Sequence, residues 1–570
     1  MALLSLGTCV ACNPFEGNNG DGTKIDTSKS QLYVSNYNGG YGTEWLNEVQ
    51  TRFEETYKDV SFEKDKVGVQ LVIRSDKDGY RGKELYEGFQ GNRNEVFFSE
   101  KIAYYDFVNS NYLLDISDVM YDGQDGTAKY NTTDPNADTK TIASKLNDVQ
   151  LNYLTKDGKV YAVPHYVGIN GITYDIDLFD VNKLYFKKNS VASEDYALDK
   201  EANGGFQGTV AYTNLAGERS AGPDGYHGTY DDGLPATYDE FFTLCAYMQN
   251  LKGIQPFTIS GQYSDAYITS LLSALTGDYE GYDQTMLNYT FDGTAKNLIT
   301  VSQNGITPDA TDTEIENSNG YELSRQAGKY YALQFLEGIK NYFDNSSKAD
   351  EDSHVAAQTR YLRSSYKGES IAFLIEGNWW ENEATSTFNA MAKDDDSYSK
   401  MNRRFGFLPL PKATNEQIGQ GQTLVDNLYG FAFISKNIDA AKIELAKTFL
   451  KFCYSDYSLV KYTETTGTLK ALNYEMDAAS QAKLSEYGRQ LWSLYTAETT
   501  KVVYQFSQNR LYLANQSNLE LKSLFQTNLG TGAFTSIVKN GVKAKAYFEA
   551  TVSFNSKTNW ANKYGSYFEE

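Results

Sequence analysis

Strand and helix patterns alternate along the chain after residue 30, and this order limits the possible folds more than any other feature. Gln31–Tyr37 (QLYVSNY) and Val67–Arg74 (VGVQLVIR) alternate apolar and polar residues with the period of a strand. Between them, Trp45–Tyr57 repeats its apolar residues at helical spacing, and Glu95–Ser99 is a third short strand. This β-α-β-α order predicts an open, mostly parallel sheet with a ligand crevice at the carboxyl ends of its strands.

A second α/β region follows a long extended segment. Lys159–Phe179 (KVYAVPHYVGINGITYDIDLF) is interrupted only by Pro and Gly and is long enough to cross from one lobe to another. Thr237 and Glu240 form a capping box at the start of a helix, with Thr237 as the cap and Glu240 reaching back. Ile371–Gly377 (IAFLIEG) and Tyr429–Ser435 (YGFAFIS) are predicted to be buried strands. The sequence therefore predicts two α/β units.

The first thirty residues differ from the rest. Met1–Cys12 (MALLSLGTCVAC) is apolar, too short to span a bilayer, and resembles a clipped signal peptide. The small residue Ala11 before Cys12, followed by the polar run Asn13–Ser30, resembles a bacterial lipobox, so Cys12 is predicted to carry a lipid; a stray leader is the alternative. The two other cysteines lie on apolar helical stripes and are predicted to be small buried hydrophobes, outside any disulfide: Cys245 and Cys453.

Composition narrows the class of partner. The chain has 52 Lys and Arg against 74 Asp and Glu, a net charge of -22, which disfavours nucleic acid and anionic membrane surfaces. A mean hydropathy of -0.53 excludes a polytopic membrane protein. The 46 Tyr, 30 Phe and 5 Trp supply amphipathic rings in unusual number, which suits an exported protein with flat, wettable binding surfaces.

Catalytic motifs are scarce. The chain has only 3 His, and no nucleophile elbow, zinc-protease motif, phosphate-binding loop or dinucleotide fingerprint accompanies them. Glycoside hydrolysis needs just two carboxylates, and Glu376, Glu381 and Glu383 flank Trp379-Trp380. These acids can equally serve as hydrogen-bonding groups at the rim of a binding site.

A Gly- and Asp-rich segment offers one possible cation site. Asp224, Asp231 and Asp232 lie among flexible glycines and could supply oxygen ligands to a structural calcium ion. The spacing does not match an EF-hand loop, so a plain cluster of Asp-Gly turns is the alternative. No other cofactor is predicted.

Several segments occur in one order that resembles a known family. The chain is similar to the carbohydrate-specific extracellular solute-binding proteins of ABC importers, which are maltose-binding-protein-like. The resemblance covers most of the chain after residue 30, with large insertions at 180–233 and 276–314. The matching segments are Tyr37–Glu55, Glu95–Ile116, Gly158–Phe179, Leu234–Leu244, Ile371–Trp380 (IAFLIEGNWW), Phe405–Lys412 (FGFLPLPK) and Tyr429–Tyr454.

The resemblance implies an α/β, two-lobe periplasmic-binding-protein-like fold, with each lobe a sheet flanked by helices and the lobes joined by hinge strands. Residues 1–12 would be the truncated signal and lipobox, and 13–30 a flexible tether. The N-lobe would comprise 31–167 and about 424–505, and the C-lobe 168–423 and about 506–570. Such lobes close on a ligand by hinge motion.

The resemblance also implies a set of ligand-binding residues. Trp379 would stack on a sugar, with Trp380 as its competitor, while Tyr263 and Tyr267 could form a second aromatic platform. Polar residues at strand ends, hinges and loops would satisfy the sugar hydroxyls. The remaining predicted contacts are Tyr37, Asn38, Ser99, Glu100, His165, Tyr166, Asn170, Glu376, Glu381, Asp426, Asn427, Thr466 and Arg510.

The function implied is capture of an oligosaccharide by a monomeric, lipid-anchored extracellular protein of a Gram-positive bacterium, and delivery to the permease subunits of an ABC importer. It would not be an enzyme, and the lipid anchor would be its sole link to the membrane. The Tyr-rich composition and the insertions favour several sugar units over a monosaccharide. A secreted glycoside hydrolase and a surface glycan-docking protein are the alternatives.

Overall fold

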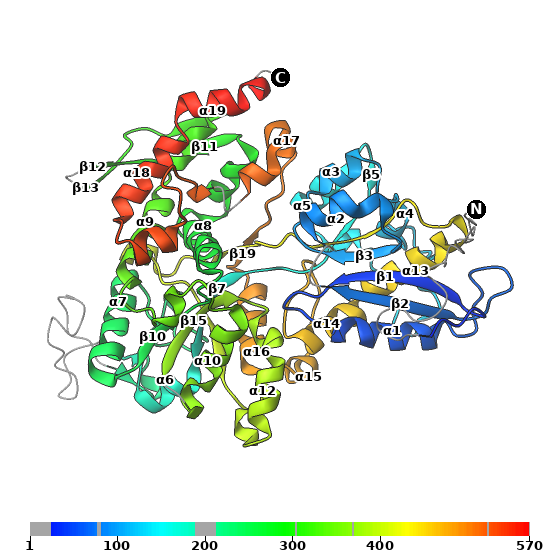
Figure 1. Ribbon diagram of the computed structural model, residues 1–570, viewed down its shortest axis with the longest axis horizontal. Helices are drawn as coiled ribbons and strands as arrows, with labels where there is room; N and C mark the ends of the chain where they lie inside the picture. The colour runs from blue at the N-terminus through cyan, green and yellow to red at the C-terminus, as the bar shows by residue number, and fades with distance from the viewer. Residues whose placement is uncertain are drawn as a thin grey trace, which may run out of the picture.

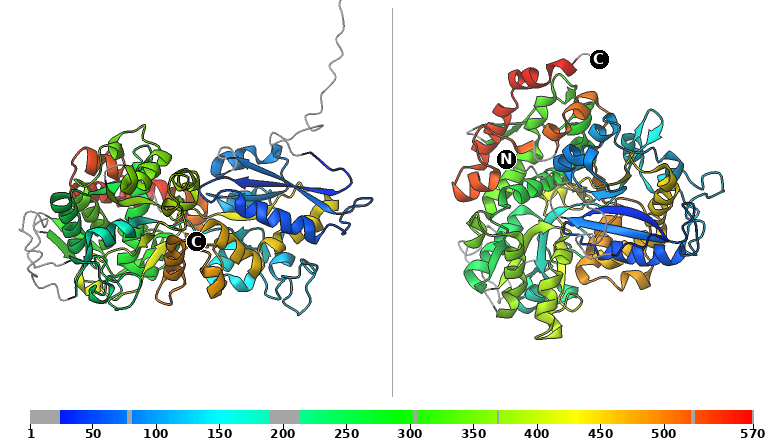
Figure 2. Two further views of the ribbon diagram at one scale, coloured as in Figure 1. Left: turned by 90° about the horizontal axis from the view of Figure 1, so that it is seen from below. Right: turned by 45° about the vertical axis from the view of Figure 1, so that its right-hand side comes forward.

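Two β-sheets form the centres of two lobes that lie side by side (Figure 1). The computed structural model describes residues 24–76, 81–188, 212–302, 305–367, 370–520 and 524–568. The predicted lipid-bearing Cys12 and the first part of the predicted tether lie outside the described residues. The left view of Figure 2 shows the same division from below.

The first sheet has the strand order β2-β1-β3-β18-β6. β1 is parallel to β2 and to β3, whereas β18 returns late in the chain and runs antiparallel to β3 and β6. The parallel part is the open sheet that the alternating pattern predicted. The strands are β1 Ser30–Tyr37, β2 Val69–Asp76, β3 Val96–Ser99, β6 Val163–Pro164 and β18 Phe431–Ile434.

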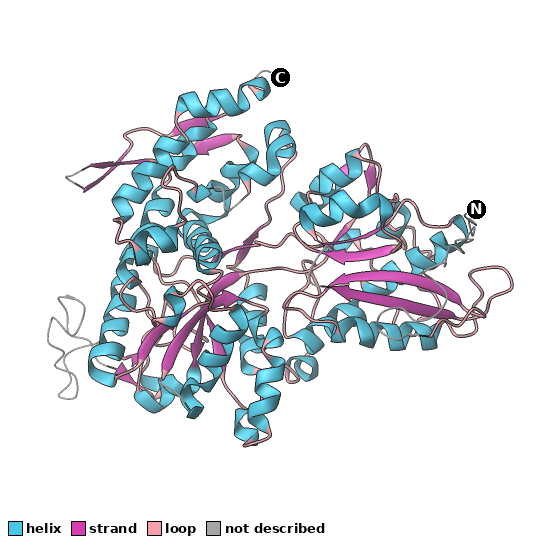
Figure 3. Ribbon diagram, in the orientation of Figure 1, coloured by secondary structure: helices cyan, strands magenta, loops and turns pink. Residues whose placement is uncertain are grey.

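Helices cover this sheet (Figure 3). On α1, Trp45 and Phe53 face the core, and Trp45 is 2% exposed with its ring centroid 5.0 Å from that of Phe98. Trp45 therefore packs its helix onto the sheet. The helices of this lobe are α1 Glu44–Thr56, α2 Gly82–Gly88, α3 Tyr104–Asn109, α4 Ser117–Met120, α5 Asp148–Leu154, α13 Ile443–Cys453 and α14 Asp456–Thr466.

The second sheet has the order β10-β15-β7-β16 and is buried except at Gln255, which begins the edge strand β10. β10 is parallel to β15, and β7 runs antiparallel to both β15 and β16. The predicted strand Ile371–Gly377 is confirmed as β15, with every residue buried. The other strands are β7 Asn170–Asp175, β10 Gln255–Thr258 and β16 Phe405–Leu408.

The second lobe carries more helix than the first (Figure 3). Its long helix α8 is kinked at Gly281 and packs on the second sheet and on α9. The helices are α6 Ile176–Asn182, α7 Tyr238–Tyr247, α8 Ser264–Thr290, α9 Ala327–Ile339, α10 His354–Lys367, α11 Trp380–Glu383, α12 Thr385–Ala392, α16 Glu486–Thr496, α17 Arg510–Leu519, α18 Ala544–Phe554 and α19 Lys557–Tyr564. The short helix α15 Ala478–Gln481 packs on α14 of the first lobe.

Small two-stranded sheets complete the described secondary structure. They are β4 Thr155–Lys156 with β5 Lys159–Val160, β8 Tyr185–Phe186 with β9 Tyr212–Thr213, β11 Gly293–Ala295 with β14 Thr313–Ile315, β12 Ile299–Ser302 with β13 Gly305–Pro308, and β17 Thr423–Val425 with β19 Lys501–Val503.

Two predictions of local structure need correction. Lys159–Phe179 is not extended to its end, because Asp175 caps α6 by accepting a hydrogen bond from the Leu178 amide at 3.0 Å. Thr237 caps α7 as predicted, but Glu240 reaches past it and accepts the Ala236 amide at 2.7 Å. Both differences are local choices of capping partner and leave the order of elements unchanged.

Three segments join the lobes. The chain passes from β6 to β7 through 165–169, returns from β17 to β18 through 426–430, and crosses again between α14 and α16. Within the predicted first-lobe segment, α16 packs on the second sheet, with the ring centroids of Tyr487 and Phe407 6.3 Å apart. The residue limits of the lobes stay a prediction.

Candidate functional site: a cleft between the lobes

A cleft of about 300 Å³ is lined by residues from both lobes and from the crossing segments. The first lobe supplies the loop after β1 and the end of β3, and the second supplies the start of α8, the start of α10 and the loop after β15. The lining residues are Tyr37, Gly39, Gly40, Tyr41, Arg81, Glu100, Lys101, Asn170, Tyr263, Ala266, Tyr267, Ser270, His354, Trp379, Glu383, Asn427 and Leu428.

Trp379 is the aromatic residue that follows β15, and its half-buried ring lies against the loop after β1. A Cβ atom added to Gly40 or to Gly377 would overlap this ring, so glycine is required at both positions for close approach. The ring centroid of Tyr41 lies 6.1 Å from that of Trp379 at an angle of 57°. Aromatic surfaces of the two lobes therefore meet at this end of the cleft.

The loop and the strand end are also joined by hydrogen bonds. The Asn382 side chain donates to the Gly40 carbonyl at 3.1 Å, and the Tyr41 hydroxyl donates to the Val167 carbonyl at 3.1 Å. Behind Tyr41, the Tyr166 ring is stacked at a centroid distance of 3.9 Å. These contacts fix the position of Tyr41 although the loop itself is rich in glycine.

A second aromatic pair lies at the start of α8. The rings of Tyr263 and Tyr267 are stacked with centroids 6.0 Å apart, and Tyr263 is 41% exposed. The His354 ring lies 5.7 Å from that of Tyr263. An exposed tyrosine ring beside a cavity can pack on the apolar C–H face of a sugar, as the sequence predicted for this pair.

Glu100 provides the acidic group on the first-lobe side. Its Oε1 accepts a hydrogen bond from Arg81 at 2.9 Å, and its Oε2 accepts one from the Tyr166 hydroxyl at 2.9 Å. The Arg81 guanidinium also lies 5.0 Å from the centroid of the Tyr37 ring. Arg81 and Glu100 thus form an ion pair, and both residues line the cleft.

The crossing segments contribute two amides. Asn427 Nδ2 donates to Asn170 Oδ1 at 2.8 Å, whereas Asn427 Oδ1 is buried with no hydrogen-bond partner in the described part of the chain. A buried acceptor without a partner costs free energy, and a ligand hydroxyl in the cleft can supply the missing donor. Asn427 is therefore a strong candidate for a polar ligand contact.

Asp426 lies beneath these amides and holds the crossing segments together. Its carboxylate accepts hydrogen bonds from the amides of Gly168 at 3.0 Å and Leu428 at 3.1 Å, and its carbonyl accepts one from Gln505 at 2.8 Å. Burial raises the pKa of Asp426 to about 6. The residue acts at the hinge and not in the wall of the cleft.

On the second-lobe side, the acidic residues are engaged by neighbours. Gln358 donates to Glu383 at 2.8 Å and to Glu376 at 3.5 Å, and His354 Nε2 lies 3.4 Å from Glu383. Burial, followed by the charge of Glu383, raises the pKa of Glu376 well above its usual range. Glu376 is 2% exposed, so Glu383 is the acid of this group that reaches the cavity.

The structure brings seven of the predicted ligand-binding residues to the cleft and places the others elsewhere. The seven are Tyr37, Glu100, Asn170, Tyr263, Tyr267, Trp379 and Asn427. Those outside the lining are Asn38, Ser99, His165, Tyr166, Glu376, Trp380, Glu381, Asp426, Thr466 and Arg510.

Each of these outlying residues has a structural environment of its own. Trp380 is 0% exposed and packs against Tyr361, Phe405 and Tyr487, because the residue after Trp379 points to the opposite side of the turn. His165 lies 2.7 Å from the buried Lys470 ammonium. The Glu381 carboxylate accepts a hydrogen bond from the Ser485 hydroxyl, and the Thr466 hydroxyl is hydrogen-bonded to that of Thr468. The Arg510 guanidinium lies over the Tyr567 ring. Ser99 is buried at the end of β3, and Asn38 is half-buried.

Sequence reasoning missed several residues that line the cleft. Tyr41 is the most prominent, and its position between Gly40 and Gly42 on a predicted ligand-facing loop was the available signal. Arg81 and His354 had none, because each reaches the cleft from the start of a helix whose orientation depends on tertiary packing. The others missed as ligand contacts are Gly39, Gly40, Lys101, Ala266, Ser270, Glu383 and Leu428.

The Gly- and Asp-rich loop is held by internal hydrogen bonds. Asp231 accepts from the Asp224 amide at 3.0 Å and from the Thr229 hydroxyl at 2.6 Å, and Asp232 accepts from the Gly228 amide at 2.8 Å. Among the described residues, no three or more His, Cys, Asp or Glu side chains are grouped to hold a metal ion. Structural calcium at Asp224, Asp231 and Asp232 stays an untested prediction.

In the described part of the chain, no helix combines the length and apolar character needed to cross a membrane.

The two cysteines of the described residues, Cys245 and Cys453, are buried and unpaired, as predicted. Burial raises the pKa of both thiols.

Comparisons with known proteins identify the fold. No family model matches the chain, and no curated protein matches it. A solved chitin oligosaccharide binding protein matches with a TM-score of 0.52 and 14% identity over 93% of this chain and 99% of that one. The SBP RafE in complex with raffinose matches with a TM-score of 0.51 and 14% identity over 93% of this chain and 100% of its own.

A third structure extends the comparison to a monosaccharide. This is the bacterial solute receptor AcbH, which is described as having an exclusive substrate preference for β-D-galactopyranose. It matches with a TM-score of 0.52 and 10% identity, over 95% of this chain and 100% of that one. These three matches span nearly the whole chain, and their descriptions are of sugar-binding proteins. The chain therefore has the two-lobe α/β fold of these proteins, as the sequence predicted.

Proposed function

We propose that the protein captures an oligosaccharide in the cleft between its lobes, outside the cell, and delivers it to the permease of an ABC importer. The observation that carries this proposal is the meeting of aromatic residues from both lobes around one cavity: Tyr37 and Tyr41 from the first, Trp379 and Tyr263 from the second. Rings on opposite walls can sandwich a sugar, and they contact it together only when the lobes are closed.

The polar residues of the cleft support a neutral ligand. The cleft is lined by two cations, Arg81 and Lys101, and by two acids, Glu100 and Glu383, so the charges of its lining compensate one another. Charged side chains held in this way still present spare donor and acceptor positions to hydroxyl groups. Asn427, with its unpartnered carbonyl oxygen, adds a further acceptor. A neutral sugar satisfies such a set without bringing an uncompensated charge into the cleft.

The size of the cleft bears on the length of the ligand. About 300 Å³ lies at the small end of the roughly 300–1,000 Å³ typical of ligand pockets. We infer that one end of the oligosaccharide packs on the half-buried ring of Trp379, and that further units extend past the exposed ring of Tyr263. The lipid on Cys12 and the polar tether would keep the binding lobes near the permease.

The alternative of glycoside hydrolysis has weaker support. Retaining and inverting glycosidases place two carboxyl groups on either side of the scissile bond. In this cleft Glu376 is enclosed beneath Glu383, and Gln358 bridges both acids. A carboxyl group enclosed in this way cannot reach a sugar on the opposite face.

Calorimetric titration of the chain with a panel of neutral plant and storage oligosaccharides tests the proposal. We expect saturable, exothermic binding, and chromatography should recover the sugar intact. Cleaved sugar would overturn the binding-protein function in favour of a hydrolase. Binding that leaves the radius of gyration unchanged in small-angle X-ray scattering would favour a rigid glycan-docking protein over importer delivery.

A further inference from the structure

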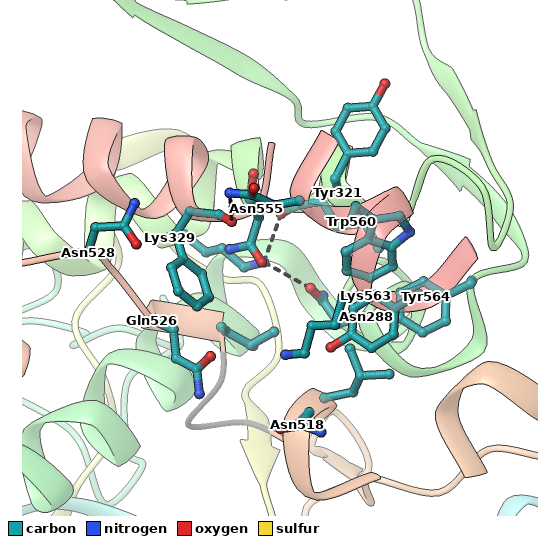
Figure 4. A pocket seen from close by; sticks show the side chains of 18 residues that line it. Asn288, Tyr321, Lys329, Asn518, Gln526, Asn528, Asn555, Trp560, Lys563 and Tyr564 are labelled. Carbon is teal, nitrogen blue, oxygen red and sulfur yellow. Dashed lines mark hydrogen bonds between the residues drawn. The ribbon is translucent and has the colours of Figure 1, made fainter. Parts of the chain in front are cut away.

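A second cavity lies within the lobe built around α8 and α9, apart from the interlobe cleft (Figure 4). It has a volume of about 160 Å³ and is formed by segments far apart in the sequence: the end of α8, the turn before α9, residues 518–519 and 524–528, and the α18–α19 region. None of its lining residues lines the cleft. The cavity is therefore a separate candidate site.

The charge of the lining is unusual for this chain. Its 18 described residues include Lys329 and Lys563 and no Asp or Glu. The whole chain carries 74 acidic residues among 570, so a random set of that size would hold about two. Amide side chains are abundant instead, including Asn288, Gln526 and Asn555. The cavity is thus a positive, hydrogen-bonding site in an acidic protein.

Lys329 is the most informative residue. It is 2% exposed, and its ammonium donates hydrogen bonds to Asn288 Oδ1 at 2.9 Å and to the Leu323 carbonyl at 2.7 Å. Both acceptors are uncharged. The nearest contributing acid, Glu280, is instead hydrogen-bonded to the Gly328 amide at 2.7 Å and to Asn297 at 3.1 Å. Within the described residues, Lys329 forms no ion pair.

Burial of an ammonium group without an ion-pair partner costs free energy and lowers the pKa of the lysine. Burial lowers the pKa of Lys329 to about 7, with Glu280 opposing the shift only in part. The second lysine, Lys563, is exposed on α19, and partial burial also lowers its pKa. An anion placed between the two side chains would supply the missing negative charge.

Aromatic rings form the remaining wall. The Trp560 ring lies 5.6 Å from Phe291 and 4.6 Å from Tyr564, measured between centroids. The indole nitrogen of Trp560 donates to the Asn317 carbonyl at 2.8 Å, so the ring surface is what remains for packing. Such a wall suits a planar or cyclic ligand body.

We propose that this cavity binds a small organic anion, a carboxylate carried on a single ring, between Lys329 and Lys563 with the ring against Trp560. The site is independent of the oligosaccharide cleft and does not rest on the proposed function.

Calorimetric titration tests the site with two acids and their neutral analogues: benzoate against benzamide, and glucuronate against methyl glucoside. The full chain would carry Trp379→Ala, so that sugar binding in the cleft does not contribute heat. We expect each neutral analogue to bind at least about tenfold more weakly than the better acid, since a charge-assisted contact is lost. Equal binding of acid and analogue, or no saturation by either acid at about 10 mM, would overturn the proposal.

Two lysines on α19 provide a matched pair of variants. Lys563→Gln removes the charge beside the cavity, whereas Lys557→Gln removes the same charge from the exposed start of the helix, outside the lining. We expect Lys563→Gln to weaken binding of the acid about three- to tenfold and Lys557→Gln to leave it within about twofold. Equal effects of the two variants would overturn the site.

Proton uptake tests the part played by Lys329 without a variant that could misfold. If the bound anion stabilises the Lys329 ammonium, binding at about pH 8 should take up protons, because the pKa of about 7 leaves the free amine mainly neutral there. Burial also raises the pKa of the neighbouring Glu280 to about 7, so this carboxyl group can add to the uptake. Titrations in buffers of different ionisation enthalpy measure this uptake. A binding enthalpy that is independent of the buffer would exclude Lys329 from the site.

Discussion

The interlobe cleft and the second cavity are both walled by aromatic rings and amides, yet they treat charge in opposite ways. In the cleft, Arg81 lies 2.9 Å from Glu100 and His354 lies 3.4 Å from Glu383. In the cavity, Lys329 has neutral acceptors and no carboxylate within hydrogen-bond distance among the described residues. We therefore expect the compensation of charge in the wall, more than its aromatic content, to select the charge of the ligand at each site.

The two sites also differ in how their walls are held together. Walls of the cleft belong to two lobes joined by crossing segments, which Asp426 ties together through Gly168 and Leu428. Walls of the cavity all pack around α8 and α9. Ligand binding in the cleft should therefore depend on the hinge and on closure, whereas binding in the cavity should not.

The largest effect is expected from Trp379→Ala. Removing the ring deletes the second-lobe half of the aromatic sandwich, and we expect affinity for the oligosaccharide to fall about 100-fold, or about 2.7 kcal/mol. Calorimetry measures the change, and Trp379→Phe should recover much of the loss because a ring remains. A Trp379→Ala protein that binds the sugar normally would place the ligand elsewhere.

A smaller effect, on stability, is expected at the hinge. Burial raises the pKa of Asp426 from 3.8 to about 6 in the folded state, so the folded protein binds more protons between these values than the unfolded chain. The contribution of Asp426 to stability is therefore greatest below about pH 4 and is lost as the pH rises through about 6. Asp426→Asn keeps an acceptor oxygen and removes this dependence.

Urea denaturation of both proteins at several pH values from 4 to 7 measures the difference. The free energy of unfolding of Asp426→Asn should gain about 2–3 kcal/mol on that of the natural protein across this range. If the free energies of unfolding of the two proteins changed in parallel with pH, burial would not raise the pKa of Asp426. Binding of an acid in the second cavity should be the same in both proteins, since the hinge does not form that site.

The smallest effect is expected from Glu100→Gln, which makes the cleft more like the cavity. The amide can still accept a hydrogen bond from Tyr166, but Arg81 loses its compensating charge. We expect affinity for an oligosaccharide ending in a uronic acid to rise about threefold relative to its neutral analogue. Glu55→Gln on α1, whose ion pair with Lys58 is exposed, is the matched control. No change in the ratio would mean that Arg81 does not face the ligand.

Sequence periodicity predicted much of the fold because strands and helices are decided by neighbouring residues. The strand before Asn378 and the capping role of Thr237 were found in this way. The end of the crossing segment was misplaced because Asp175 caps a helix there, and one competing local hydrogen bond decides such a boundary. Caps and strand ends are therefore predictable to within a few residues and no better.

The candidate site was predicted only in part, and Trp379 and Trp380 show why. Both follow the same strand, and their types and spacing are equally suited to a sugar site. The structure places Trp380 in the core against Phe405 and leaves Trp379 at the cleft against Gly40. That choice depends on a residue about 340 positions away, which no local pattern includes.

The sequence by itself determined the alternation of elements, the acidic charge, the wealth of tyrosine and the aromatic pair after a buried strand. Tertiary structure decided which rings share a cavity, which charges are paired, and that the buried Lys329 ammonium donates its hydrogen bonds to uncharged acceptors. The physical reason is the distance along the chain over which each interaction acts. Periodicity and capping act over a few residues, whereas burial and charge compensation depend on groups that only folding brings together.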